Sequence, residues 1–395
     1  MPALESFGYP GLGDQELRTE TNLEVTKLLS NFTKVKYVGR NGVALPESYN
    51  GLGIRNLIYM LFQIYGFHKS YRSEQVKPSA HLVFIEEPEA HLHPQMQEVF
   101  IRKLTELSTN WQKPNDPWSV QFVVSTHSSH IANESGFESI RYFLNYGDTS
   151  SDRKAKVKDL RKGLKDTPQK TRNFVHEYLT LTRCDLFFAD KAILVEGLSE
   201  RLILPIVIRK LEEESEITNN LTSQYLTIME VGGAYAQNFF DLLKFLELPS
   251  LVVTDIDSVG GTERRKCTVS KGTATSNSCI KSWFDGDKNL TPKDLISKSQ
   301  EKKIKEKIRI SYQIPEKGQG ACGRSFEDAF MLANKEKFKL DNVVEDKLEE
   351  TALEEAGKLK KSDFALKYSI RDKQWLVPLY ISEGLAWLSD FDSKT

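Results

Sequence analysis

The sequence lacks any apolar stretch near the roughly 20 residues that a helix needs to span a bilayer. It also begins without the pattern of a signal peptide. We therefore expect a cytoplasmic protein that makes no use of a membrane.

The sequence also has few cysteines and almost no net charge. The four cysteines are scattered and form no CxxC pair, which argues against a zinc ribbon and against a disulfide framework. The net charge is −1 at pH 7, so binding to nucleic acid would have to come from local patches. A phosphate-binding loop of the form G-x-x-x-x-G-K-[ST] is absent from all 395 residues.

What the sequence does have is the composition of a globular protein, with 39% hydrophobic and 28% charged residues. At 395 residues the chain can form two or three domains with cores of their own. Residues 1 to about 45 are rich in loops, with a helix expected over 22–29. Because no apolar strand opens this segment, we expect the chain to be the later part of a longer protein.

An apolar strand followed by two acids is the clearest feature of the first 150 residues. Residues 82–85 predict a fully buried strand, and Glu86 and Glu87 follow at its carboxyl end. Such a pair suits one group that holds Mg²⁺ and one that orients a water for attack on a phosphate. His91 and His93 lack a third ligand nearby, which favours a turn over a metal site there.

Two further segments place polar groups at the ends of elements. Residues 121–124 predict a second buried strand, with His127 at its tip. Residues 46–53 form a polar, glycine-containing turn that leads into an apolar helix. Free N–H groups at a helix N-terminus can hold an anion, although a Ser or Asn at such a position is more often a simple cap.

A basic segment separates the two halves of the chain. Residues 148–172 mix many lysines and arginines with several aspartates. A solvated linker helix explains this composition at least as well as a surface that faces DNA. We place the first domain at 1–150, the linker at 151–185 and the second domain at 186–395.

The second domain alternates strand and helix patterns. Aliphatic runs at 192–195, 225–229 and 251–254 alternate with helical patterns at 200–213 and 236–246. This alternation predicts an α/β domain with a mostly parallel sheet. Open sheets of this kind keep their ligand crevices at the carboxyl ends of the strands.

Four acidic residues are predicted to gather at that edge of the sheet. Glu196 follows the first strand, and Glu200 falls in the first turn of a helix that Ser199 is placed to cap. Asp255 and Asp257 follow the third strand, and residues two apart in an extended chain face the same side. Such carboxylates repel one another unless a divalent cation binds. If only the two glutamates are considered, Glu196 could simply end a strand and Glu200 could simply interact favourably with the helix dipole.

The rest of the domain adds an insertion and another helix start. Residues 260–299 are rich in Ser, Thr, Lys and Gly, which predicts an inserted or mobile loop. After a strand at 308–314, Ser325 and Asp328 form a capping-box pattern. That pattern gives Asp328 a structural role and leaves Glu327 free for another.

Three motifs of the first domain resemble those of ABC-type ATPases, in the branch that includes the OLD (overcoming lysogenization defect) family and relatives of SMC proteins. FIEEPEAHLHP resembles a Walker B strand and D-loop, STHSSHI a switch-histidine loop, and SYNGLGIRNLIYM a divergent signature motif. The resemblance implies that Glu86 binds Mg²⁺, that Glu87 is the hydrolytic base and that His127 senses the γ-phosphate. It implies contacts to ATP across a dimer from Ser48, Asn50 and Gly51.

In the second domain an EG-x-x-E turn, a D-x-D strand end, a GRSFEDAF segment and a KKSDFAL segment resemble, in this order, the Toprim domain of OLD-family nucleases. The resemblance covers most of the chain from about residue 40. Lys361, directly before the expected helix cap Ser362, would be the catalytic lysine, with Lys360 the second candidate; Glu196 and Asp255 would act in catalysis as well. The implied metal ligands are Glu196, Glu200, Asp255, Asp257 and Glu327.

These patterns together predict an α/β protein in which a partial ABC-type ATPase lobe, its phosphate-binding loop missing, precedes a Toprim domain with a mostly parallel sheet and a helical or loop insertion. The predicted function is a DNA endonuclease that uses Mg²⁺ or Mn²⁺, with two ions about 4 Å apart, and that uses ATP in the full-length protein. The resemblance also implies a homo-oligomer, a role in bacterial defence against phage and a helicase partner.

Three other functions were weighed against this one. A topoisomerase needs a nucleophilic tyrosine on a separate DNA-binding domain, for which the chain has little room. A bacterial primase normally carries a zinc module, which the scattered cysteines do not supply. A non-catalytic, ATP-responsive module that binds nucleic acid and holds a structural metal remains the alternative.

Overall fold

The computed structural model describes residues 16–21, 33–38, 42–46, 49, 51–110, 118–146, 154–182, 185–232, 235–285 and 290–391. The chain divides into two compact units, Met1–Gly136 and Phe137–Thr395. No helix within the described ranges combines the length and the apolar character that a membrane span requires.

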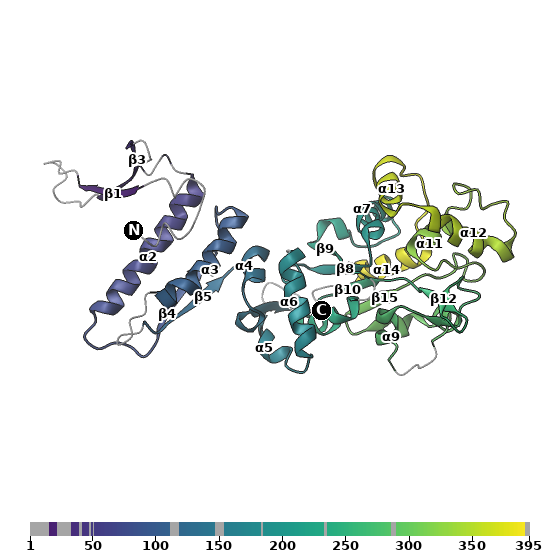
Figure 1. Ribbon diagram of the computed structural model, residues 1–395, viewed down its shortest axis with the longest axis horizontal. Helices are drawn as coiled ribbons and strands as arrows, with labels where there is room; N and C mark the ends of the chain where they lie inside the picture. Colours follow the sequence, from purple (N-terminus) through teal and green to yellow (C-terminus); the bar gives the residue numbers. More distant parts are fainter. Residues whose placement is uncertain are drawn as a thin grey trace. The chain divides into compact units, whose positions relative to one another are not determined.

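The first unit contains a parallel strand pair and two long helices (Figure 1). Strands β4 (His81–Glu86) and β5 (Val120–Ser125) pair in parallel, with Glu86 opposite Ser125. Helices α2 (Leu52–Ser73) and α3 (Pro94–Asn110) contribute most of its core, and the short α4 (Ser129–Glu134) follows β5. A separate antiparallel sheet has the order β1 (Glu16–Thr21), β2 (Thr33–Val38), β3 (Ala44–Pro46).

The prediction of fully buried strands in this unit was wrong. In β4, Val83 and Ile85 are buried, but Leu82 is 52% and Phe84 67% exposed. Successive side chains of a strand point to opposite faces. Among the described residues the core covers only the face that carries Val83 and Ile85.

A close backbone approach joins the start of α2 to the turn after β4. Gly53 lies so near the carbonyl oxygen of His91 that an added Cβ would stand 2.2 Å from that oxygen. Asn56 donates a hydrogen bond to the carbonyl of Ala90 in the same turn, at 2.9 Å. His91 lies in this turn and has a φ of +64°, so the predicted turn is present.

The second unit is built on a five-stranded sheet with the order β14-β15-β10-β8-β9. The strands β8 (Lys191–Val195), β9 (Leu226–Glu230), β10 (Ser250–Val253) and β15 (Ile308–Ser311) run parallel, and only β14 (Ile304–Lys305) is antiparallel. The predicted mostly parallel sheet is therefore confirmed. Since β8 has β9 on one side and β10 on the other, the chain reverses its direction of winding at β8.

Helices cover both faces of this sheet, so every residue of its central strands β8, β10 and β15 is buried. Residues of α7 (Leu198–Glu213), α11 (Phe326–Ala333), α13 (Lys361–Leu366) and α14 (Leu379–Asp390) pack with β8 and β10 in one core cluster. Segment η5 (Ala236–Phe239) and helix α8 (Phe240–Leu246) connect β9 to β10, and α8 contacts β15. The buried Lys191 donates to the carbonyls of Leu388 and Ser389 at the end of α14.

The segment predicted as an insertion is folded. Strands β11 (Ser258–Gly260), β12 (Arg265–Lys266) and β13 (Ala274–Thr275) form a small sheet of order β12-β11-β13. Two short helices follow, α9 (Ser278–Trp283) and α10 (Pro292–Ile296). Residues 258–299 are called the insertion below.

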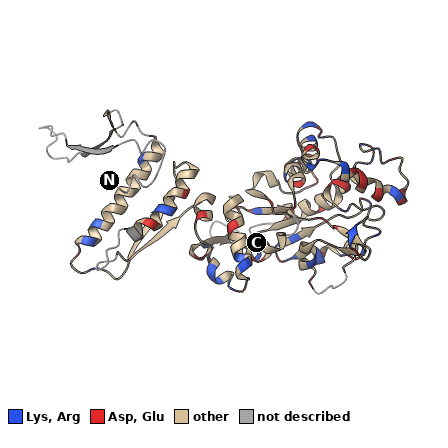
Figure 2. Ribbon diagram, in the orientation of Figure 1, with Lys and Arg blue, Asp and Glu red and all other residues tan. Residues whose placement is uncertain are grey.

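The basic segment is not a single linker helix where the structure describes it. It contains strand β7 (Lys154–Asp159), which pairs with β6 (Arg141–Tyr146), then the short α5 (Leu160–Gly163) and the start of α6 (Gln169–Thr182). Lys158 is buried and binds the Glu247 carboxylate at 2.5 Å, and Lys156 binds the same group at 2.9 Å. Part of the positive charge is thus neutralised inside the second unit, although several Lys and Arg residues lie along the ribbon at α5 (Figure 2).

The close approach at Gly53 generates a stability prediction. Gly53→Ala should lower the free energy of unfolding of the first unit by roughly 1–3 kcal/mol, because the new methyl group must displace a backbone carbonyl. Gly66→Ala is the control, since a Cβ there meets nothing within 4 Å and alanine favours a helix by up to about 1 kcal/mol.

The measurement is hydrogen–deuterium exchange of peptides from residues 51–110 in the full chain under mild urea. Faster exchange in Gly53→Ala and unchanged or slower exchange in Gly66→Ala are expected. Equal exchange in Gly53→Ala and the unmodified chain would contradict the contact.

Candidate functional site

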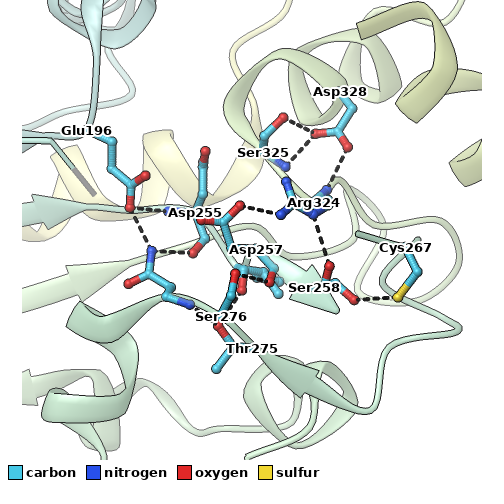
Figure 3. Close-up of polar contacts among 12 residues, drawn as sticks. Glu196, Asp255, Asp257, Ser258, Cys267, Thr275, Ser276, Arg324, Ser325 and Asp328 are labelled. Carbon is cyan, nitrogen blue, oxygen red and sulfur yellow. Dashed lines mark hydrogen bonds and ion pairs between the residues drawn. The ribbon is translucent and has the colours of Figure 1, made fainter. Parts of the chain in front are cut away.

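The carboxyl ends of two neighbouring strands bring acidic side chains together. Glu196 follows β8 and Asp255 follows β10 after one further residue, and these strands pair in parallel. Glu200 lies in the first turn of α7 and Glu327 in the first turn of α11. We call these four residues, with Asp257, the acidic crevice; Figure 3 shows three of them, Glu196, Asp255 and Asp257.

Burial and mutual repulsion disfavour ionisation in the acidic crevice. Burial raises the pKa of Asp255 well above its ordinary value, and the charges of Glu196, Glu200, Asp257 and Glu327 raise it further. Burial, then Glu327 and Glu196, raise the pKa of Glu200 to about 7. Burial is also the main cause that raises the pKa of Glu196. The structure thus brings all five acids within electrostatic reach of one another.

Hydrogen bonds orient the Glu196 carboxylate. Its Oε1 accepts from the backbone N–H of Asp255 at 3.0 Å, from Asn277 Nδ2 at 2.7 Å and from the Thr254 hydroxyl. These donors come from the two residues that follow β10 and from the insertion. The carboxylate is therefore held against the neighbouring strand rather than extended into solvent (Figure 3).

A buried glutamine holds Asp255. Gln313 Nε2 donates to Asp255 Oδ1 at 2.6 Å, and its Oε1 accepts from the backbone N–H of Ile256 at 2.8 Å. Gln313 follows β15 and is fully buried. Because both ends of its amide are occupied, the side chain fixes the loop that carries the aspartate.

Asp257 does not continue the extended strand. Its φ is +49°, in the left-handed region, so the prediction that Asp255 and Asp257 share one side of a strand was wrong. Its carboxylate pairs instead with Arg324 Nη2 at 2.7 Å, while Arg324 Nε donates to the carbonyl of Ser258 (Figure 3). Asp257 remains close enough to Asp255 to raise its pKa.

The helix starts differ from the expectation at two positions. Helix α7 begins at Leu198 with Gly197 as its N-cap, and the Ser199 hydroxyl donates to Glu327 Oε1 at 2.8 Å instead of capping. Helix α13 begins at Lys361 with Lys360 as its N-cap, so Ser362 is not a cap either. Gly197 and Lys360 supply the extended backbone that an N-cap needs, but neither makes a side-chain capping bond.

The predicted capping box of α11 is confirmed. The Asp328 carboxylate accepts from the N–H groups of Ser325 and Arg324, at 2.6 and 2.9 Å. Glu327 is not free, however. Besides Ser199 it contacts Lys361 Nζ, which lies 3.2 Å from Glu327 Oε1.

Lys361 brings a positive charge to the acidic crevice. Burial lowers its pKa, but Glu327 and Asp255 raise it more, so the pKa is raised overall. The ammonium group is thus held in its charged form beside the carboxylates.

The donor set fits a hard divalent cation. Carboxylate oxygens are the ligands that Mg²⁺ and related ions take, and a cation would relieve the repulsion that raises the pKa values of Glu196, Glu200 and Asp255. As they stand, no three His, Cys, Asp or Glu side chains in the described part of the chain are gathered tightly enough to hold an ion. The reason is that Glu196, Asp257 and Glu327 are each turned toward partners in the protein.

Sequence analysis missed the residues that position these acids. Asn277, Gln313 and Arg324 come from the insertion, the end of β15 and the turn before α11. The only local signal is that Asn277 precedes a helix, and that pattern predicts a cap. Their contacts to the acidic crevice depend on the tertiary fold.

A second polar group lies in the first unit. Glu87 follows β4 with a φ of +45°, and its N–H donates to the Ser125 carbonyl at 3.1 Å. His127 Nε2 lies 3.4 Å from Glu87 Oε1, and Glu89 accepts from the His127 N–H at 2.6 Å. Burial and then Glu89 raise the pKa of Glu87. The parallel pairing of β4 and β5 therefore brings together two of the predicted ATP-site residues.

Two more of the predicted ATP-site residues lie at the ends of described elements. Glu86 ends β4 as predicted, and Gly51 is the N-cap of α2 without a side-chain bond. Ser48 and Asn50 lie outside the described residues.

Two protein-family models match parts of the chain. Residues 2–132 match the model of an AAA ATPase domain. Residues 187–257 match the TOPRIM domain of proteins described as overcoming lysogenization defect protein-like. The predicted resemblance to OLD-family proteins and the α/β fold class are thereby confirmed.

Two curated relatives extend over much of the chain. Endonuclease GajA of Bacillus cereus (strain HuB5-5) is 28% identical over 93% of this chain and 57% of its own length. OLD nuclease of Thermus scotoductus (strain ATCC 700910 / SA-01) is 28% identical over 54% of this chain and 37% of its own length. The chain thus spans about half the length, or less, of these relatives.

Among solved structures, the C-terminal region of the Burkholderia pseudomallei OLD protein matches with 18% identity and a TM-score of 0.31. The match covers 51% of this chain and 98% of that one. The low TM-score means that the fold described above rests on the present structure alone.

The raised pKa of Glu200 predicts that this residue lowers the free energy of unfolding at high pH. Folding raises the pKa of this carboxyl group from 4.5 to about 7, so its ionisation destabilises the folded state. The full destabilisation is present above pH 7, and none is present below pH 4.5. Glu200→Gln should therefore raise the free energy of unfolding by about 3 kcal/mol at pH 8, and by much less at pH 5.

Urea unfolding in EDTA at the two pH values measures this difference. Glu213→Gln, at an exposed position of the same helix, is the control and should change stability at neither pH. A destabilised Glu200→Gln at pH 8 would show that the carboxylate is compensated within the protein.

Proposed function

We propose that this chain is the nuclease part of a DNA endonuclease whose activity depends on a divalent cation and is coupled to an ABC-type ATPase. The observation that supports the proposal best is the acidic crevice, where five carboxylates and Lys361 gather at the carboxyl ends of β8 and β10. A purely structural role would not require five acids whose mutual repulsion opposes folding.

In the proposed site Glu196, Glu200, Asp255, Asp257 and Glu327 are the ligands. A divalent cation supplies Lewis acidity toward a phosphate oxygen and toward the water that attacks it, and two ions can act on opposite sides of the phosphorus. Asp257 and Glu327 would exchange Arg324 and Lys361 for the ion, since both now lie in ion pairs. Mg²⁺ or Mn²⁺ suits this all-oxygen set.

Lys361 would act on the phosphate itself. Its Nζ contacts Glu327 at 3.2 Å, so release of that carboxylate to a cation frees the ammonium group for a non-bridging phosphate oxygen. There it would offset the charge that grows in the transition state. Lys360 is the N-cap of α13, whereas Lys361 contacts Glu327, which makes Lys361 the better candidate.

The first unit would supply part of an ATP site. Glu86 is placed to bind Mg²⁺, and Glu87 to orient the attacking water beside the γ-phosphate sensor His127. The contact between Glu87 and His127 supports this assignment. Because the sequence has no phosphate-binding loop of the G-x-x-x-x-G-K-[ST] form, we propose that the site is incomplete in this chain and that ATP acts in a longer protein. Ser48, Asn50 and Gly51 would reach ATP across a dimer.

The biological setting is proposed from the relatives. Two of them are named as an endonuclease and a nuclease, which supports DNA as the substrate. A homo-oligomer, a helicase partner and a role in defence against phage are proposed from the resemblance to the OLD family alone, and a cytoplasmic location stays the expectation drawn from the sequence patterns.

Nicking of supercoiled plasmid tests the proposed function and the role of Lys361. The chain should nick DNA with Mn²⁺ or Mg²⁺ and stop when EDTA is added. Lys361→Ala should reduce the single-turnover rate at saturating Mn²⁺ roughly 100-fold or more, since loss of one charged transition-state contact costs about 3–4 kcal/mol.

Lys360→Ala is the matched control, because it removes the neighbouring charge but leaves the contact to Glu327. Its rate should stay within a few-fold of the unmodified chain. Nicking that persists in EDTA would exclude the proposed chemistry, and equal mild effects of both substitutions would remove Lys361 from the mechanism.

A further inference from the structure

We propose that Asn277 is a positioning residue for Glu196 and that, through it, the insertion sets the affinity of the acidic crevice for a divalent cation. The inference rests on the proposed function, because it takes Glu196 to be a metal ligand. Asn277 belongs to none of the motifs that carry the resemblance to OLD-family nucleases.

The orientation of the Asn277 amide is fixed by a helix. Its Oδ1 accepts from the N–H groups of Cys279 and Ile280, at 2.9 and 3.2 Å, and so caps α9. Only the oxygen of the amide can accept these bonds. The NH₂ group must therefore point the other way, into the acidic crevice.

The NH₂ group faces three acceptors there. Nδ2 lies 2.7 Å from Glu196 Oε1, 2.8 Å from the Thr254 hydroxyl and 2.8 Å from the carbonyl of Asp255. An amide has two N–H donors, so the three acceptors share them. Asn277 is buried, with 4% of its surface exposed, and water does not replace these bonds easily.

The residues beside Asn277 lock the insertion onto the loop that carries the aspartates. The Thr275 hydroxyl donates to the carbonyl of Ile256 at 2.6 Å. Ser276 donates to the carbonyl of Asp257 from both its N–H and its hydroxyl, each at 3.0 Å. Three consecutive residues of the insertion thus bind three consecutive carbonyls, which fixes where the Asn277 side chain stands.

The consequence for Glu196 is a preset orientation. The hydrogen bonds described for its carboxylate, from Thr254, Asp255 and Asn277, all fall on Oε1. The rotation of the group is thereby fixed before an ion binds. Hydrogen bonds that orient a ligand in this way typically change metal affinity 10- to 100-fold when they are removed.

A helix cap does not require an asparagine, so a variant with another capping residue can test the role of the NH₂ group. Serine caps helices about as well, so Asn277→Ser keeps an acceptor for α9 and removes both donors to the acidic crevice. Asn334→Ser is the matched control. Asn334 is also buried, and its side chain makes three hydrogen bonds of similar length, but to backbone groups of Phe330 and Leu376 rather than to an acid.

The experiment is calorimetric titration of the full chain with MnCl₂, beside plasmid nicking over a range of Mn²⁺ concentrations. Asn277→Ser should raise the Kd for Mn²⁺ about 10-fold or more. The Mn²⁺ concentration for half-maximal nicking should rise in parallel, with a smaller change in the maximal rate. Asn334→Ser should lower the unfolding temperature and leave the Kd within about twofold.

The outcomes separate the inference from the proposed function. An unchanged Kd in Asn277→Ser overturns the inference and leaves the nuclease in place if the unmodified chain nicks DNA. Mn²⁺ binding without nicking removes the nuclease, while the Kd of Asn277→Ser still decides the role of Asn277. An unmodified chain that binds no Mn²⁺ overturns both. Should Asn277→Ser fail to fold, Asn277→Thr, which also caps, must show the same rise in Kd.

Discussion

The repulsion among buried carboxylates at the carboxyl ends of β8 and β10 governs the architecture of the second unit. Burial and neighbouring negative charges together raise the pKa values of Asp255, Glu200 and Glu196. Four of the five acids, Glu196, Asp255, Asp257 and Glu327, are each held in place by a specific partner in the protein. The fold therefore spends stability to keep negative charge concentrated in one place.

The partners come from parts of the chain that are far apart in sequence. Asn277 reaches the site from the insertion and Gln313 from the end of β15. Arg324 pairs with Asp257, and Lys361 with Glu327. These partners orient the acids, and the positive charges of Arg324 and Lys361 also offset part of the negative charge of the acids. An arrangement of this kind is ready to exchange internal ion pairs for a bound cation.

The sequence predicted the parallel sheet and the acids at its edge, because an aliphatic run followed by an acid depends only on local order. It did not predict the left-handed turn at Asp257, which Arg324 stabilises from another segment. Nor did it predict that Gly197 rather than Ser199 caps α7, since the competing partner of Ser199 lies on α11. The predictions that were wrong concern features that depend on tertiary contacts.

In the first unit, too, the local pattern predicted the elements, and the tertiary contacts determined the rest. Apolar residues 82–85 correctly predicted a strand, but the exposure of Leu82 and Phe84 depends on what covers each face. The helices cover only one face within the described residues. The juxtaposition of Glu87 and His127 follows from the parallel pairing of β4 and β5, because both residues lie just beyond the same end of this strand pair.

The central claim is that the acidic crevice holds a divalent cation. Anomalous X-ray diffraction from crystals of the full chain soaked in MnCl₂ tests it most directly. The account predicts a manganese peak among Glu196, Glu200 and Asp255, with the Glu327 carboxylate turned away from Lys361. Manganese peaks only at other sites, with both internal ion pairs of the acidic crevice intact, would contradict it.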